Sequence, residues 1–145
     1  MLGIMSQILD HRDLEAWQIA MDAVIETYRV TALFPRSELY GLTSQMRRAA
    51  VSAPSNIAEG QGRGNAVRAC LNHFGIALGS LAELDTQLEV AIRLAYVTVS
   101  ETNDLKRRIE SSRRLVHGLR RATQRRLLGT ASGALFAFAL IRLLS

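Results

Sequence analysis

Apolar residues recur every three or four positions along most of the chain, and this spacing predicts amphipathic α-helices. Four such segments follow one another, separated by short polar or glycine-rich stretches. We expect the first helix to begin behind an N-cap at Asp13 and to end before Pro35, because the residue before a proline avoids helical geometry. Its predicted inner stripe consists of Leu14, Trp17, Met21, Val24, Tyr28 and Thr31.

The second helix is predicted to begin near Ser37, a candidate N-cap, and to stop at Gly60 and Gly62. Pro54 lies inside it, lacks a backbone donor and crowds the carbonyl four residues earlier, so we expect a kink near Ala50. The predicted inner stripe consists of Leu39, Leu42, Met46, Ala49, Ala53 and Ile57.

The third helix is the longest of the four and is expected from Asn65 to Tyr96. Small residues at Gly75, Gly79 and Ser80 predict close packing against another helix. The predicted inner stripe consists of Cys70, Phe74, Ala77, Leu81, Leu84, Leu88, Ala91 and Ala95.

The fourth helix is expected to begin at Ser100, which can act as its N-cap. Its inner stripe would consist of Leu105, Ile109, Ser112, Val116 and Leu119. Four amphipathic helices with short connections predict an all-α fold, an antiparallel up-down four-helix bundle.

We expect the bundle to span residues 13–126, between an N-terminal extension over residues 1–12 and a hydrophobic C-terminal tail over residues 127–145. Residues 127–141 carry no charge, yet this run is shorter than the ~20 residues of a membrane-spanning helix. We expect the tail to be a helix that packs against a partner or is loosely ordered. Membrane contact through residues 127–144 and an extension without function are the alternatives.

The compartment follows from two features of the sequence. The start of the chain lacks the basic residues and the cleavage site of a secretory signal. The single cysteine, Cys70, excludes an internal disulfide, and its neighbours predict a buried small side chain. A cytoplasmic location is therefore expected.

The net charge of +5 is distributed unevenly. Ten basic residues from Lys106 onwards stand against one acid, Glu110, whereas residues 1–105 carry eight basic and twelve acidic residues. Two rows of cations with a spacing of seven form a basic ridge on the outer side of the fourth helix: Lys106, Arg113 and Arg120, and Arg107, Arg114 and Arg121. Because few acids compensate their repulsion, the basic ridge predicts an anionic partner, and a solvated face is the alternative.

For nucleic acid as that partner, the candidate contacts are Arg107, Arg113, Arg114, Arg120 and Arg121, with Arg47 and Arg63 as weaker candidates. Few aromatic residues are available for base stacking, so we expect contacts to phosphates rather than recognition of bases.

The sequence offers no constellation for catalysis. The stretch "GQGRGN" at 60–65 follows a helix rather than a strand, and Asn65 stands where a dinucleotide-binding motif needs its third glycine. No histidine follows a glutamate by three residues, as a di-metal bundle site requires, and no serine or cysteine lies in a nucleophile elbow. We expect no catalytic, cofactor or metal site.

Several polar residues lie near the predicted inner faces and need partners there. Arg48 with Glu59 or Glu83 is the expected buried pair, and its expected role is to fix the helix register. A small-ligand pocket and a catalytic carboxylate pair are the alternatives. The polar residues of this predicted core are Gln45, Arg48, Asn56, Glu59 and Glu83, with Asp85 and Gln87 beside them.

Specific motifs follow one another along the chain: Trp17 with Gln18, "FP" at 34–35, "YGL" at 40–42, "QMRRAAVS" at 45–52, "SNIAEG" at 55–60 and "GSLAELDTQLEVA" at 79–91. In this order and spacing they closely resemble the 23S rRNA intervening-sequence proteins, from about Asp13 to Leu119. The chain departs from that pattern at Ala53, where isoleucine is usual, and at Ala66 and Val67, where a lysine–glutamate pair is frequent.

This resemblance implies a left-handed antiparallel bundle that assembles into a ring-like homopentamer, with no agreed catalytic residue. It also implies a link to nucleic acid, since some members are encoded within insertions in bacterial large-subunit rRNA genes. A related branch assists the reverse transcriptase of diversity-generating retroelements. Our hypothesis is a non-enzymatic nucleic-acid-binding homo-oligomer. The alternative is a scaffold or accessory subunit that docks a protein such as a reverse transcriptase.

Overall fold

The structure, a computed structural model, describes the backbone from Asp10 to Leu143 and the surroundings of the side chains from Asp10 to Gly129. Over this range the chain forms four α-helices and two short 3-10 helices, with no strand. In chain order they are η1 (His11–Asp13), α1 (Glu15–Thr31), η2 (Arg36–Glu38), α2 (Leu42–Gly62), α3 (Val67–Arg93) and α4 (Val99–Leu143).

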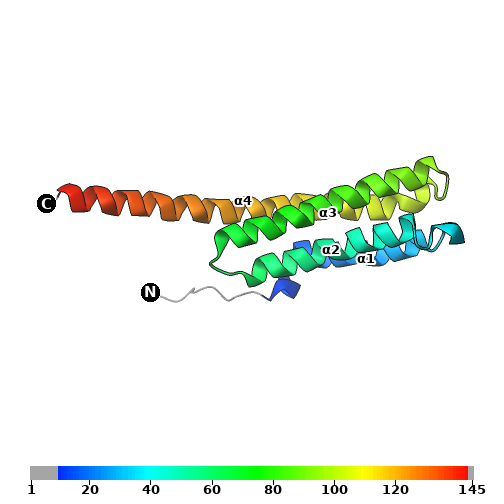
Figure 1. Cartoon of the computed structure of the whole chain (residues 1–145), viewed down its shortest axis with the longest axis horizontal. Helices are drawn as coiled ribbons and strands as arrows, with labels where there is room; N and C mark the ends of the chain where they lie inside the picture. Colours follow the sequence, from blue (N-terminus) through cyan, green and yellow to red (C-terminus); the bar gives the residue numbers. More distant parts are fainter. Residues whose placement is uncertain (1–9, 144–145) are drawn as a thin grey trace.

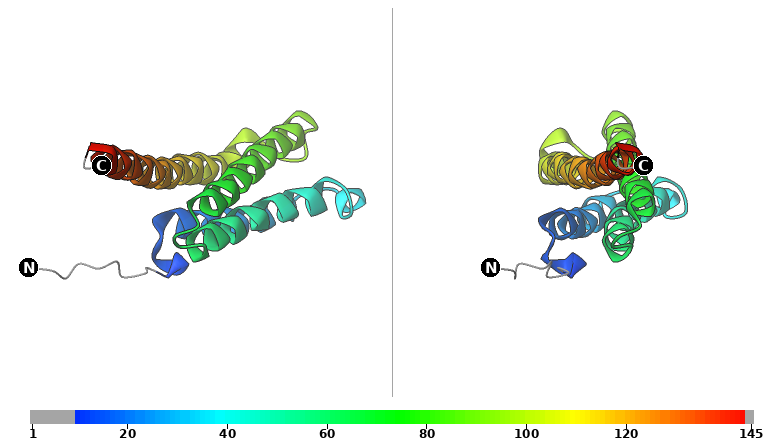
Figure 2. Two further views of the ribbon diagram at one scale, coloured as in Figure 1. Left: turned by 60° about the vertical axis from the view of Figure 1, so that its left-hand side comes forward. Right: turned by 90° about the vertical axis from the view of Figure 1, so that its left-hand side faces the viewer.

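The helices pack as an up-down four-helix bundle, which confirms the predicted all-α fold (Figure 1). The neighbouring pairs are α1 with α2, α2 with α3, α3 with α4, and α4 with α1. Because α2 and α4 are not a neighbouring pair, they lie on opposite corners of the bundle (Figure 2). A surface carried by α2 therefore faces away from a surface carried by α4.

Two clusters of buried side chains fill the bundle along its length. One lies towards the α3–α4 connection and is built around Met46, Leu84 and Ile109. The other lies towards the α2–α3 turn and is built around Ile57 and Phe74. Full burial of a large apolar side chain stabilises the fold by about 1.5–3 kcal/mol, so these positions hold the helices in register.

The predicted inner stripes of the last three helices are largely confirmed. Leu42 and Leu119 are half-buried, and Leu39 is half exposed because it lies in the turn between η2 and α2. The predicted inner positions that are buried in these helices are Met46, Ala49, Ala53 and Ile57 in α2, Cys70, Phe74, Ala77, Leu81, Leu84, Leu88 and Ala91 in α3, and Leu105, Ile109, Ser112 and Val116 in α4.

The predicted inner stripe of α1 is confirmed in part, since Val24 and Thr31 are buried and the half-buried Leu14 and Trp17 pack against the core. Trp17 and Met21 are only half-buried and Tyr28 is 46% exposed, whereas a row of small residues faces the core. Small side chains let α1 approach its neighbours closely, and the larger residues remain at the edge of the interface. The buried residues of α1 are Ala16, Ala20, Ala23, Val24, Thr27, Val30 and Thr31.

The predicted N-caps of the first two helices are also wrong. Leu14 occupies the N-cap position of α1, and Asp13 belongs to the 3-10 turn before it. At α2 the capping group is a carboxylate rather than the hydroxyl of Ser37, since the Leu42 amide donates to Glu38 Oε2 at 2.9 Å. The Tyr96 hydroxyl donates to the other oxygen of Glu38 at 2.9 Å. This second bond ties the start of α2 to the segment between α3 and α4.

At the start of α4 the cap is Thr98 rather than the predicted Ser100. The Glu101 amide donates to Thr98 Oγ1 at 3.3 Å, and the Thr98 amide donates to Glu101 Oε2 at 2.8 Å. These reciprocal bonds form a capping box, which satisfies two backbone donors that the first turn of a helix leaves free. Both Thr98 and Ser100 have suitable side chains, but only Thr98 has a glutamate three residues later.

Helix α3 is shorter than predicted at both ends. It ends at Arg93 because Ala95 adopts a left-handed conformation with φ of 57°. The Tyr96 amide bonds the Ala91 carbonyl at 3.0 Å and the Ala95 amide bonds the Ile92 carbonyl at 2.9 Å, which is the pattern of a Schellman cap. The prediction that Ala95 continues the inner stripe is therefore wrong, and its side chain is exposed.

The special residues of α2 and α3 have different roles in the fold. Pro54 lies inside α2 as predicted, and the kink near Ala50 stays a prediction. Gly62 is the last residue of α2, whereas Gly60 is buried within the helix. Among the small residues of α3, Ser80 packs against α2 through a 2.8 Å hydrogen bond to Ser52. A Cβ at Gly75 or Gly79 would meet open space, so the predicted close packing is wrong for the two glycines.

Helix α4 passes through the predicted boundary at Arg126 without a break and continues to Leu143. The predicted tail is therefore helical over its described backbone, while the packing of side chains 130–145 lies outside the described residues, as does the N-terminal extension before Asp10. Over residues 10–129, whose side-chain surroundings are described, no helix meets the length and apolarity needed to span a membrane.

Gly60 provides a test of the α2–α3 packing. A Cβ built on Gly60 would lie 2.6 Å from Cε1 of Phe74, a buried ring. We expect Gly60→Ala to lower the free energy of unfolding by about 1–3 kcal/mol, because the ring has to move within a packed core. Gly75→Ala is the matched control, since its Cβ enters open space on a helix, and we expect no loss or a gain of up to ~1 kcal/mol. Urea denaturation of both variants measures these changes, and equal effects would contradict the close approach.

The caps predict a loss of stability in acid. The bond from the Leu42 amide, followed by that from the Tyr96 hydroxyl, lowers the pKa of Glu38 below 4.5, and the bond from the Thr98 amide lowers the pKa of Glu101. A lowered folded-state pKa gives stability above the unfolded-state value, and this stability is lost as pH falls through the folded-state pKa.

We therefore expect the melting temperature to fall as pH decreases below about 4.5, and Glu38→Gln to show a smaller fall than the wild type. Glu110→Gln, at an exposed position of α4, is the control and should follow the wild-type profile. A Glu38→Gln profile parallel to that of the wild type would show that Glu38 contributes nothing to it.

Candidate nucleic-acid interface

The structure places the basic ridge on the outer side of α4, as the sequence predicts. The opposite side of this helix is fixed in the core by Leu105, Ile109 and Val116, each with 0% exposure. Of the six ridge residues, Arg113 and Arg120 are half-buried, and the exposed ones are Lys106, Arg107, Arg114 and Arg121. The ridge therefore faces solvent, but its two rows have different surroundings.

The first row leans towards α3 and meets acids there. Arg113 Nη1 lies 3.9 Å from Asp85 Oδ2. The pKa of Glu89 is lowered chiefly by the hydrogen bond from Arg93 Nε, at 2.8 Å, and to a smaller degree by the charge of Lys106. Further along the row, the Nε of Arg120 is buried and has no hydrogen-bond partner within the described part of the chain. Only Arg120 in this row has no acid beside it in α3.

Acids also neutralise the beginning of α4 on its other side. Arg107 pairs with Asp104, and Arg108 donates both to Asp104 Oδ2 at 2.8 Å and to Asp22 Oδ2 of α1 at 2.7 Å. The hydrogen bond from Arg108, supported by the charges of Arg108 and Arg107, lowers the pKa of Asp104. Arg108 thus ties α4 to α1, and Arg107 is a weaker nucleic-acid candidate than the sequence indicates.

The second half of the basic surface has no such neutralisation. The one hydrogen bond of the Arg114 side chain within the described residues goes to Ser111 Oγ, at 3.3 Å. No acid in the described part of the chain forms an ion pair with Arg120, Arg121 or Arg125, and the latter two are exposed. We refer to Arg114, Arg120, Arg121 and Arg125 as the distal arginine cluster. The positive charge is therefore concentrated where α4 leaves the bundle.

Arg125 was not among the sequence-predicted site residues. It follows Arg114 by eleven residues and Arg121 by four, spacings that return a helix to nearly the same face, so the signal was present in the sequence. The following residue, Arg126, has a different position, because its Nη2 donates to Asn65 Oδ1 at 3.3 Å. This contact places the α2–α3 turn beside the last part of α4 that belongs to the bundle.

The two weaker candidates do not join the distal arginine cluster. Arg63 is the C-cap of α2 and pairs with Glu59 at 3.5 Å. Arg47 lies between α1 and α2, where its guanidinium carbon is 4.4 Å from the centre of the Tyr28 ring and its Nε donates to Thr31 Oγ1 at 3.0 Å. Because α2 is diagonal to α4, Arg47 belongs to a different surface of the molecule.

The predicted buried pair between Arg48 and Glu59 or Glu83 is wrong. Arg48, Glu83 and Gln45 are exposed, because they lie on the outer sides of α2 and α3. The Glu83 side chain accepts a hydrogen bond from Gln87 Nε2 at 2.9 Å, within its own helix. Gln45, Arg48 and Glu83 therefore do not form a polar core.

The polar network that does exist joins α2 to α3. Asn56 Nδ2 donates to the Ser52 carbonyl at 2.9 Å, and Asn56 Oδ1 lies 3.1 Å from His73 Nδ1. His73 Nε2 faces Glu59 Oε2 at 3.5 Å. The Ser52 hydroxyl bonds Ser80 at 2.8 Å rather than the imidazole, so the network contains no serine activated by a histidine. Its geometry suits the alignment of two helices.

Sequence reasoning identified Asn56 and Glu59 but missed Ser52, His73 and Ser80. Their spacings were visible in the sequence, four residues in α2 and seven in α3, which place each set on one face of its helix. Within the described residues, no group of three His, Cys, Asp or Glu side chains is arranged to hold a metal ion. The structure therefore indicates a surface rather than a reaction centre as the candidate site.

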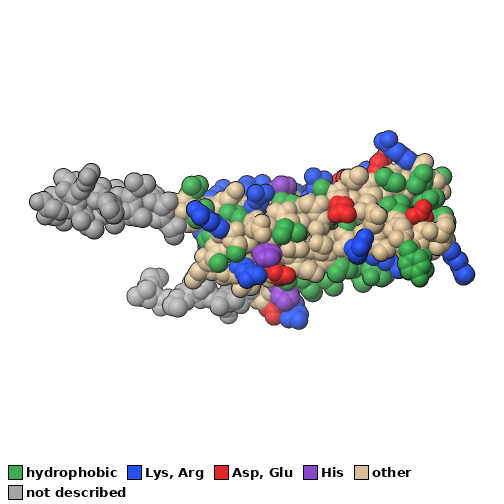
Figure 3. Space-filling view, viewed as in Figure 1, with side chains coloured by type: hydrophobic (Ala, Val, Ile, Leu, Met, Phe, Trp, Pro, Cys, Tyr) green, Lys and Arg blue, Asp and Glu red, His purple; other side chains and the backbone are tan. Residues whose placement is uncertain are grey.

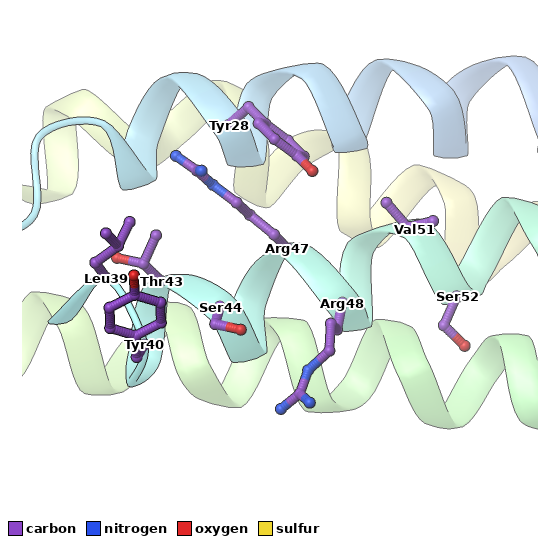
Figure 4. Close-up of a pocket in the computed structure, with 9 residues that line it drawn as sticks. All are labelled: Tyr28, Leu39, Tyr40, Thr43, Ser44, Arg47, Arg48, Val51 and Ser52. Atoms are coloured by element: carbon purple, nitrogen blue, oxygen red, sulfur yellow. The ribbon is translucent and has the colours of Figure 1, made fainter.

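A groove between α1 and α2 is the other prominent surface. A pocket of about 610 Å³ lies over α2 beside Tyr28 of α1, with Arg47 directed towards α1 and Arg48 towards the other side of α2 (Figure 4). A second pocket of about 280 Å³ lies between α1 and α2 and shares Val51 with the first. Tyr40, which is 91% exposed, and Val51, which is 44% exposed, lie at the groove. We call this surface the α1–α2 groove; it is lined by Trp17, Met21, Val24, Tyr28, Leu39, Tyr40, Thr43, Ser44, Arg47, Arg48, Val51, Ser52, Pro54, Ser55 and Ala58.

Hydrophobic side chains gather along this side of the molecule, over α1 and α2, in the space-filling view (Figure 3). Exposed apolar patches of this kind commonly mark sites of contact with another macromolecule. The protein therefore carries two surfaces of different chemistry: an apolar groove on α1 and α2, and a cationic cluster on α4.

Comparison with known proteins assigns the chain to a family. The sequence model of the 23S rRNA-intervening sequence protein matches residues 12–118, which includes α1, α2, α3 and the first part of α4. No curated protein is similar enough in sequence to count as a relative. The match covers most of the bundle and agrees with the four packed helices. The chain belongs to the 23S rRNA-intervening sequence protein family.

Proposed function

We propose that this protein is a non-enzymatic nucleic-acid-binding protein, which contacts the phosphate backbone of RNA or DNA through the distal arginine cluster. The observation that carries the proposal is the charge distribution along α4. Arg107 and Arg113 have carboxylates beside them, whereas no carboxylate pairs with Arg114, Arg121 or Arg125 within the described residues. Arginines that already have partners gain little from a phosphate, but unpaired arginines gain new charge-assisted hydrogen bonds.

The composition of this surface favours contacts to phosphates over contacts to bases. No Phe, Tyr or Trp lies on α4 between Val99 and Gly129, and the exposed His117 is the one aromatic ring there, so this part of the cluster offers little surface for base stacking. Phosphate contacts do not depend on sequence, and they weaken as salt increases. We therefore expect binding with low sequence preference.

The α1–α2 groove supports a second part of the proposal, a homo-oligomer. Tyr40, Leu39 and Val51 are too exposed and too apolar for a surface that faces only water. The resemblance to ring-forming proteins makes another copy of the chain the expected occupant. Because α2 is diagonal to α4, a contact through this groove leaves the distal arginine cluster accessible, and several copies would bind a polyanion with combined strength. Light scattering tests the assembly: a particle of several chains is expected, and a mass of 16.0 kDa would contradict it.

The alternative function is a scaffold that docks another protein, such as a reverse transcriptase. The α1–α2 groove favours it equally, since Arg47 and Arg48 add positive charge to an apolar surface and would suit an acidic partner with apolar side chains. Reversing the charge of the distal arginine cluster distinguishes the two functions, because a scaffold of this kind does not bind nucleic acid through that cluster.

Charge reversal in the distal arginine cluster tests nucleic-acid binding. We expect the triple variant Arg114→Glu, Arg121→Glu, Arg125→Glu to bind duplex DNA and structured RNA at least roughly a hundredfold more weakly than the wild type, because cations that displace counterions are replaced by repelling charges. All three side chains are exposed, so the fold should be retained. Fluorescence anisotropy with labelled oligonucleotides measures the affinity, and circular dichroism checks the helix content.

The control variant carries the same change of charge elsewhere: Arg12→Glu, Arg36→Glu and Arg93→Glu, three exposed positions outside α4. We expect its affinity to stay within about threefold of the wild type, since only the long-range field changes. Equal losses in both variants would assign binding to net charge alone. Unchanged binding in the first variant would reject the proposed interface.

A further inference from the structure

Helix α4 is longer than the bundle that it belongs to. Within residues 10–129 its last buried side chain is Thr123, and Arg126 donates a hydrogen bond to Asn65 in the α2–α3 turn. Beyond this contact Leu128 is 69% exposed, and a Cβ at Gly129 would meet open space. We call the remaining part, Leu127–Leu143, the α4 projection. It leaves the bundle as a single helix (Figures 1 and 2).

The sequence of the α4 projection does not suit a helix that stays in water. No charged residue occurs from Leu127 to Ile141, and Arg142 is the one charge after that. A surface helix normally combines an apolar stripe with a polar face, whereas an apolar helix without a polar face is found inside a protein or a bilayer. Since isolated short helices are marginal in water, the α4 projection needs surroundings that cover it.

The charges just before the α4 projection indicate what those surroundings are. Arg121 and Arg125 are exposed and form no ion pair with the described acids, and Arg126 follows directly. Cations next to an apolar helix match the boundary of an anionic lipid leaflet, where each Lys or Arg adds attraction to the headgroups. An apolar protein surface would not need this group of arginines at its edge.

We propose that the α4 projection inserts into a lipid bilayer, with Arg121, Arg125 and Arg126 at the level of anionic headgroups. From Leu127 to Leu143 the helix is roughly 25 Å long, which is short of the ~30 Å thickness of a hydrocarbon core, so the α4 projection inserts into the bilayer rather than crossing it. Small residues at Gly129, Gly133 and Ala137, four apart, have the spacing with which helices approach each other closely within membranes. This inference shares Arg121 and Arg125 with the proposed nucleic-acid interface, but it rests on the apolar sequence that follows them.

Flotation of the full chain with vesicles tests the proposal. One vesicle contains phosphatidylcholine alone, and the other contains equal parts of phosphatidylcholine and phosphatidylglycerol. We expect the wild type to float with both vesicles, more strongly with the anionic one, and to stay bound to both in high salt. Binding through arginines alone would disappear in high salt, because screening reduces the attraction between exposed charges.

Two variants separate the apolar and the cationic contributions. Phe136→Glu with Phe138→Glu should lower the partition coefficient for both vesicles at least about tenfold, because charges are costly in hydrocarbon. Ala82→Glu with Thr86→Glu is the matched control at exposed positions of α3, and it should float like the wild type. Arg125→Gln with Arg126→Gln should remove the preference for anionic vesicles and keep the binding to neutral ones.

Three outcomes would overturn the proposal. The first is a wild-type protein that floats with neither vesicle. The second is a Phe136→Glu, Phe138→Glu variant that floats as well as the wild type. The third is a wild type that stays unbound while this variant forms a smaller particle in light scattering, which would assign the α4 projection to contact between copies of the chain.

Discussion

The orientation of α4 about its own axis is the constraint on which both the core and the arginine surface depend. Leu105, Ile109 and Val116 are completely buried, so the helix cannot turn without exposing them. A rotation of one residue would move each of them away from the core by about 100°. This fixed rotation places the distal arginine cluster towards solvent, and Arg108 secures it through bonds to Asp22 of α1 and Asp104. The core therefore determines which arginines are available to a partner.

The unequal distribution of acids along α4 gives the helix three successive regions. At its beginning, Asp104 of the same helix and Asp85 of α3 lie against the arginines and hold the bundle together. Further along, the distal arginine cluster lacks such acids within the described residues. Beyond Arg126 the helix leaves the bundle and its sequence becomes apolar. The same continuous helix thus serves packing first, and then presents charge and apolar surface to other molecules.

The sequence predicted the large buried side chains of α2, α3 and α4, because Leu, Ile and Phe at helical spacing mark a core face strongly. It was less accurate for α1, where it identified Val24 and Thr31 but missed the alanines that face the core, because small side chains are a weaker signal of burial than large apolar ones. The caps were also missed. Ser37 and Ser100 have suitable side chains, but the capping hydrogen bonds are accepted by Glu38 and Thr98. The sequence predicted that the basic ridge lies on the outer side of α4, but not that acids pair with Arg107 and Arg113. The pairing of Arg108 with Asp22 joins residues 86 positions apart, and no local pattern reveals that contact.

The central claim is that unpaired arginines of α4 bind phosphates, and the salt dependence of nucleic-acid binding by the wild type tests it most directly. The measurement is a titration of nuclease-treated protein against labelled duplex DNA and structured RNA, repeated from about 50 to 200 mM salt. Our account predicts measurable binding at the low end and a decrease in affinity of roughly tenfold or more over this range, as several phosphate contacts are replaced by counterions. No binding at low salt, or an affinity that salt leaves unchanged, would contradict it.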